Sequence, residues 1–151
     1  MELKATVREK YGEAALRART GRSSCCGGAA ASALAGQRIF QNGVGPNGQL
    51  IPRTGGMMMA TSCAGCHGPN GHGGRTAGFA APDITYRNLT NPAGMIEVTG
   101  EHGMVYTDAL IRRAVTQGVG ADGDALNTYM PRWQLTDQEW ADLLAYLKTL
   151  P

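Results

Sequence analysis

The chain has 151 residues and a mass of 15.9 kDa, which suits one small domain with a tail and is short for a two-domain enzyme. Glycine occupies 22 positions and charged residues make up only 17% of the chain, so much of the backbone is expected in loops and turns. The formal net charge of +2 is too small to favour nucleic acid or an anionic membrane as a partner. No apolar run approaches the roughly 18 residues of a transmembrane helix, so we expect a soluble chain without a transmembrane segment.

The first 31 residues differ in composition from the rest and are interpreted as an N-terminal tail. Residues 1–22 carry six basic and three acidic groups, whereas the remaining residues have a net charge of −1. The segment 2–19 is rich in good helix formers, but its apolar face is too thin to persist without tertiary packing. An uncharged run begins at Ser23, and we expect the main domain to cover residues 32–151.

Two of the helices predicted in the main domain precede its C-terminal segment. The first covers residues 32–42, with Ser32 as its N-cap and Gly43 just after its end. The second covers residues 107–118, where apolar residues recur at helical spacing and a threonine or an aspartate can cap the first turn.

A third helix is predicted at the C-terminus, where Thr136 and Glu139 have the spacing of a capping box. Between residues 43 and 106 no period of 2 or 3.6 persists, and strands are poorly supported. The prediction is an all-α fold of three main helices joined by long glycine-rich loops. A loop of about 60 residues is unusual in a compact domain, unless a bulky cofactor organises it.

The segment Cys63-Ala64-Gly65-Cys66-His67 has the spacing Cys-x-x-Cys-His, which is the attachment pattern of c-type haem. Two thiols one helical turn apart can each form a thioether to a haem vinyl group, and the adjacent imidazole can bind the iron. A zinc site, a thioredoxin-like dithiol and a structural disulfide are the alternatives. Zinc would need two further ligands, and a thioredoxin-like motif would need a βαβ unit, for which no pattern precedes Cys63.

Residues from about 35 to 150 resemble a class I cytochrome c. The segments that carry the resemblance are, in chain order, GQRIFQNG, SCAGCHG, APDIT, TDALIRRAVTQG, YMP and LTDQEWADLLAYLKTL. The resemblance implies a small all-α fold in which one covalently bound haem c forms much of the core. It also implies that the two terminal helices cross closely, with Gly36 and Phe40 meeting Leu143 and Tyr146.

The resemblance further implies the ligands of the haem iron. Cys63 and Cys66 would tether the haem, His67 would bind the iron, and Met130 occupies the place of the distal ligand. Pro82 lies 15 residues after His67, where its carbonyl would accept the Nδ1 proton of the imidazole, although it can also be a simple loop proline. The remaining candidates for the distal position are Met104, Met95, His102 and an open site. Residues that could line the pocket or reach the haem propionates are Trp133, Tyr86, Arg75 and Arg87.

The expected compartment follows from the cofactor and not from the N-terminus. Haem attachment normally takes place on the far side of the bacterial inner membrane, so a periplasmic or other extracytoplasmic location is expected. A signal peptide has a basic start, an apolar stretch and a small-residue cleavage site. The charged residues 1–22 and the weakly apolar stretch that follows do not make a convincing one.

The segment VREKYGEAALRARTGRSSCCGG resembles the extreme N-terminus of arsenite methyltransferases. This resemblance covers only about 25 residues, and no α/β methyl-donor domain follows, so the methyltransferase activity is not carried over. The vicinal thiols of Cys25 and Cys26 could still bind a thiophilic species such as arsenite.

Together these patterns predict a monohaem electron carrier, or a cytochrome subunit of a respiratory or dehydrogenase complex, that is not an enzyme by itself. Its partners would be redox proteins that donate and accept electrons. The alternative is a binding or sensing module, in which a labile distal haem site takes a ligand or Cys25 and Cys26 take a metalloid.

Overall fold

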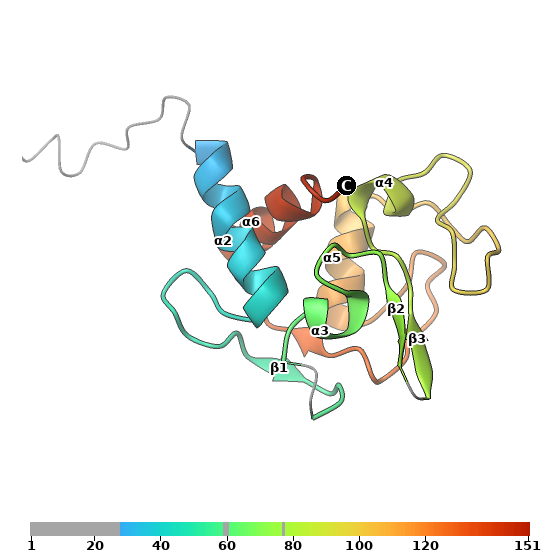
Figure 1. Ribbon diagram of the computed structural model, residues 1–151, viewed down its shortest axis with the longest axis horizontal. Coiled ribbons are helices and arrows are strands. Elements are labelled where there is room, and N and C mark those ends of the chain that lie inside the picture. Colours follow the sequence, from blue (N-terminus) through green and yellow to red (C-terminus); the bar gives the residue numbers. More distant parts are fainter. Residues whose placement is uncertain (1–27, 59–60, 77) are drawn as a thin grey trace, which may run out of the picture.

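The computed structural model describes residues 28–58, 61–76 and 78–151, and Figure 1 shows their arrangement. Helices make up most of the regular secondary structure of the described residues, in agreement with the predicted all-α class. In chain order the elements are α2 (Gly28–Asn42), β1 (Arg53–Thr54), α3 (Ala64–His67), β2 (Gly74–Thr76), β3 (Phe79–Ala81), α4 (Tyr86–Leu89), α5 (Asp108–Gln117), β4 (Arg132–Trp133) and α6 (Asp137–Leu147). The helix expected over residues 2–19 lies outside the described residues.

Helix α2 begins earlier than the sequence predicts. It starts at Gly28, so Ser32 lies inside the helix and is not its N-cap. The Ser32 hydroxyl instead donates a hydrogen bond of 2.5 Å to the Asp142 carboxylate in α6. The other end of α2 is as predicted: Gly43 has a φ of 67°, and its amide donates to the carbonyl of Ile39 at 2.9 Å.

Helices α2 and α6 cross at close range (Figure 1). Gly36 makes this crossing possible, because a Cβ at this position would lie 1.9 Å from the backbone oxygen of Asp142. One turn later the ring of Phe40 packs against that of Tyr146, with their centroids 5.4 Å apart. Phe40 and Leu143 are fully buried, so the contact expected between the terminal helices is present.

The caps of α5 and α6 are those that the sequence predicts. Thr107 caps α5 by accepting a hydrogen bond from the amide of Leu110, and Gly118 ends the helix in the left-handed conformation. At the start of α6, Thr136 and Glu139 form both hydrogen bonds of a capping box. These termini depend on residues within four positions of each other, which is why the sequence alone locates them.

The long segment between α2 and α5 contains short strands that the sequence does not predict. β1 pairs with β4 in an antiparallel ribbon, and β2 pairs with β3 in a second one. Each strand has two or three residues, too few to produce an alternating pattern. The loops between them return to a common core, whose buried members are Ile39, Phe40, Ile51, Leu89, Met95, Ile111, Trp133, Trp140, Leu143 and Leu147.

Candidate functional site

Helix α3 holds the two cysteines and the histidine of the Cys-x-x-Cys-His segment. The amides of Cys66 and His67 donate to the carbonyl of Cys63 at 3.2 and 2.9 Å, so the segment forms a single helical turn. The Ser62 hydroxyl accepts from the amide of Gly65 and supports the start of this turn. Residues three apart on a helix share one face, so Cys63 and Cys66 are turned to the same side.

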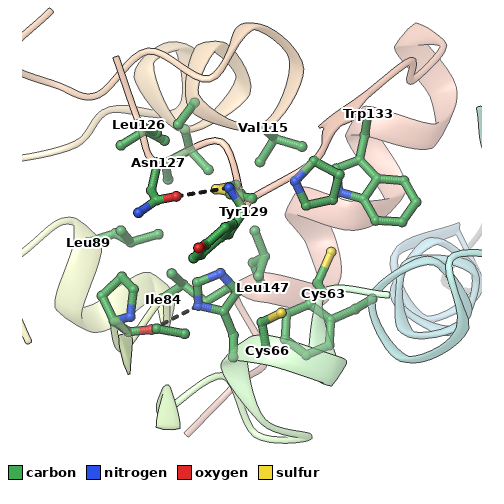
Figure 2. A pocket seen from close by; sticks show the side chains of 18 of the residues that line it. Cys63, Cys66, Ile84, Leu89, Val115, Leu126, Asn127, Tyr129, Trp133 and Leu147 are labelled. Carbon is green, nitrogen blue, oxygen red and sulfur yellow. Dashed lines mark hydrogen bonds between the residues drawn. The ribbon is translucent and has the colours of Figure 1, made fainter. Parts of the chain in front are cut away.

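Both cysteines and His67 line one apolar cavity in the middle of the fold. It encloses ≈ 1230 Å³, part of which is open to solvent. In Figure 2, Cys63 and Cys66 lie on one side of this cavity, and Leu126 and Asn127 lie across from them. The lining contains no Asp, Glu, Lys or Arg among the described residues. The site therefore suits a large, flat, mostly apolar ligand that is held at one edge.

His67 is buried and oriented by Pro82. The imidazole Nδ1 lies 2.9 Å from the Pro82 carbonyl oxygen, the contact that the sequence analysis expects. A carbonyl can only accept, so the proton is on Nδ1 and the lone pair of Nε2 is free to bind a metal. Burial lowers the pKa of His67, while the Pro82 hydrogen bond and the negative charge of Asp83 act in the opposite direction. The imidazole is therefore neutral near pH 7, as a metal ligand must be.

The cysteine thiols are free in the described structure. Burial raises the pKa of Cys63 to about 12, and the neighbouring Cys66 adds to this increase. Cys63 is therefore a neutral thiol at pH 7 and an unfavourable place for a thiolate. A thioether is uncharged, so covalent attachment of a ligand through this sulfur matches its apolar surroundings.

Met130 lines the same cavity from the segment that precedes β4. Its amide donates to the carbonyl of Asn127 at 3.1 Å, which forms a tight turn before the buried Pro131. Met95 also lines the cavity, but Met104 and His102 do not.

The other methionines are less suitably placed. Met57 and Met58 lie outside the cavity lining and are exposed, Met58 at 95% of its surface. Met1 and Met59 lie outside the described residues. Among the described methionines, Met95 and Met130 are thus the ones that border the cavity.

The cytochrome c family model matches residues 33–151, which is more than three-quarters of the chain. The chain belongs to the cytochrome c family. Neither the search of curated proteins nor that of solved structures gave a match. Membership in the family establishes covalently bound haem c, with its iron, as the cofactor and haem-based electron transfer as the general function.

The cavity of this cytochrome c fits a haem on observations of its own residues. Its walls are apolar, its two thiols lie on one helical turn, and the adjacent imidazole presents an unprotonated Nε2. The zinc alternative is not supported, because in the part of the chain that the structure describes no three His, Cys, Asp or Glu side chains converge on a metal position. The two thiols and the imidazole therefore fit a haem and its iron.

Several further residues of the cytochrome c pocket could not be assigned from the sequence. Trp133 lines the cavity, whereas Tyr86, Arg75 and Arg87 are not part of its lining. The sequence analysis did not single out Phe79 and Tyr106, which also border it. Tyr106 directly precedes the cap of α5, a position where an apolar residue often packs against the helix. Phe79 begins β3, in a glycine-rich stretch of sequence without such a signal.

Cytochrome c domains are typically extracytoplasmic, in agreement with the compartment that haem attachment implies. None of the helices in the described residues is both long and apolar enough to cross a membrane. The family also suggests interaction with redox partner proteins. Cys25 and Cys26, the expected thiophilic pair, lie outside the described residues.

Proposed function

We propose that this cytochrome c carries single electrons through a haem whose iron is bound by His67 and Met130. The observation that carries the proposal is that both residues line one apolar cavity. The segment that leads to Met130 starts at Leu126 and Asn127, which lie across the cavity from the cysteines (Figure 2). A donor from this segment would approach a bound haem from a different wall of the cavity than the turn that holds His67.

The residues of the chain have distinct roles in this proposal. The bound haem supplies a one-electron couple between ferrous and ferric iron. Cys63 and Cys66 tether it, and the Pro82 carbonyl fixes the tautomer and orientation of the His67 ring. The Met130 thioether is a soft donor that favours the reduced iron and raises the potential.

The same cavity argues for a carrier and against an enzyme. Among the described residues no Asp, Glu, Lys or Arg lines it, and its one histidine, His67, would bind the iron. Tyr129 borders the cavity and is 48% exposed, so the cavity approaches the surface beside it. Electrons would be exchanged there with a donor and an acceptor protein, either by a free carrier or by the cytochrome subunit of a larger complex in the bacterial periplasm.

The proposal is tested on protein produced in cells that contain a haem-attachment system. A pyridine haemochrome spectrum and the intact mass should show one covalent haem per chain. The oxidised protein should have the weak red absorption band of methionine-ligated ferric haem, and the reduced protein should not bind carbon monoxide.

Met130→Leu should remove this band and allow carbon monoxide to bind, because the distal position is left without a donor. Met95→Leu is the matched control, since it removes the other methionine of the cavity at similar volume and should leave the band in place. If the band persists in Met130→Leu, or if the unmodified protein binds carbon monoxide, the ligation by Met130 is wrong. The second of these results would support the alternative of a labile distal site.

A further inference from the structure

Arg132 makes an unusual set of contacts two residues after Met130. One guanidinium nitrogen, Nη1, donates to the carbonyls of Asn127, at 3.1 Å, and Met130. The other, Nη2, donates to the carbonyl of Leu126 at 2.8 Å and lies 3.5 Å from that of Gly118. A single side chain thus connects the end of α5 with the segment that leads to Met130.

These contacts use the specific shape of arginine. The guanidinium is planar and presents its donors as a rigid fork, whereas a lysine ammonium is a compact charge that cannot span several carbonyls in the same way. Gly118 provides the space for it, because a Cβ there would lie 1.9 Å from the guanidinium Nε. The last carbonyls of a helix lack intrahelical partners and attract a cation, so the C-terminal end of α5 is a favourable place for this group.

Every backbone carbonyl from residue 126 to residue 130 has a hydrogen-bond donor. Apart from the Met130 amide, which also donates to Asn127, the donors come from two places. Arg132 supplies those of residues 126, 127 and 130. The amides of Gly56 and Met57 supply those of Thr128 and Tyr129, at 3.0 and 3.3 Å. The segment 126–130, here named the Met130 loop, is therefore held on one side by the residues that follow β1 and on the other by Arg132.

We propose that Arg132 is a positioning residue that holds the Met130 loop closed over the haem cavity and so keeps the thioether on the iron. The inference rests on the proposed ligation by Met130. Arg132 itself does not line the cavity, so it acts through the backbone of the loop and not on the haem. Without the guanidinium, three carbonyls of the loop lose a charged donor together, while the hydrogen bonds of residues 128 and 129 with Gly56 and Met57 remain.

The test compares Arg132→Lys and Arg132→Gln with the unmodified haem-loaded chain. Both variants keep a polar side chain but lose the fork, so the loop should open more often. We expect carbon monoxide to bind the reduced variants at least about tenfold faster than the unmodified protein, since the lost charge-assisted hydrogen bonds are worth at least one factor of ten. The methionine band of the oxidised variants should also disappear at a lower pH.

Arg112→Lys is the matched control. Arg112 lies in the middle of α5, and its guanidinium pairs with Asp137 at the surface and makes no hydrogen bond to the Met130 loop. This variant should bind carbon monoxide as slowly as the unmodified chain. Covalent attachment uses the segment 63–67, which Arg132 does not contact, so the Arg132 variants should still carry haem.

The outcomes separate the two proposals. An unmodified protein without the methionine band overturns the ligation by Met130 and this inference together. A band that is present in the unmodified protein, combined with unchanged carbon monoxide binding in both Arg132 variants, overturns the inference alone. Urea unfolding of each variant measures the free energy of unfolding and tests whether Arg132 only stabilises the fold. If the rate of carbon monoxide binding rises only in proportion to the loss of this free energy, Arg132 is not a positioning residue.

Discussion

Asp83 places a negative charge close to His67. Its carboxylate accepts hydrogen bonds from the amide and hydroxyl of Thr85, at 2.8 and 2.7 Å, and lies 3.1 Å from Nδ1 of His72. Burial raises the pKa of Asp83, but these hydrogen bonds and the nearby imidazole outweigh it, so the net shift is to below 3.8. Asp83 is therefore ionised at pH 7, next to the carbonyl that orients His67.

We expect Asp83→Asn to raise the reduction potential of the haem. A nearby negative charge favours the ferric over the ferrous iron, and asparagine removes this charge while retaining an acceptor for Thr85. The measurement is potentiometry of both proteins at several pH values. The difference should be present at pH 7 and should vanish as the pH falls through the folded pKa of Asp83, where the aspartate becomes neutral.

Glu101→Gln changes the net charge by the same amount and serves as the control. Glu101 is exposed, does not line the cavity and makes its side-chain contact with the nearby Thr99. Equal shifts of potential in the two variants would contradict a local effect of Asp83.

At the scale of elements, the sequence predicts what depends on neighbouring residues and misses what depends on distant ones. The caps of α5 and α6 and the Cys-x-x-Cys-His turn are local, and each was predicted. Ser32 is not the N-cap that its sequence position suggests, because α2 begins at Gly28 and the Ser32 hydroxyl binds Asp142, 110 residues away. The ribbon of β1 and β4 joins segments about 80 residues apart.

The crossing of α2 and α6 gives a direct test at this scale. Gly36→Ala should destabilise the haem-loaded protein by about 3 kcal/mol, because the added Cβ would overlap the backbone of Asp142 and the helices must separate. Alanine is otherwise the better residue in a helix, so a loss of stability can only come from this contact. Urea unfolding followed by far-ultraviolet circular dichroism measures the change.

Gly28→Ala is the matched control in the same helix. A Cβ at this position has no heavy atom within 4 Å, so the free energy of unfolding should change by less than about 0.5 kcal/mol. If both variants are as stable as the unmodified chain, the close crossing of the helices is not required for the fold.

At the scale of the whole molecule, the haem cavity and the hydrophobic core share the same residues. Phe40, Leu89, Ile111, Leu143 and Leu147 belong to the buried core and also line the cavity. The helices therefore contact one another at the edges of the cavity, and their inner faces meet the haem when it is bound. This arrangement explains how the long, glycine-rich segment between α2 and α5 can be part of one core with the helices.

It follows that the chain should lose its fixed tertiary structure when the haem is absent. In Cys63→Ala, Cys66→Ala protein the inner faces of the helices surround an apolar cavity that no side chain fills, and a cavity of this kind is costly. We expect part of the helical signal to remain in far-ultraviolet circular dichroism, near-ultraviolet signals to disappear, and the dye ANS to bind. Haem-loaded protein is the reference. A cooperative thermal transition of the haem-free variant close to that of the reference would show that the core is complete without its cofactor.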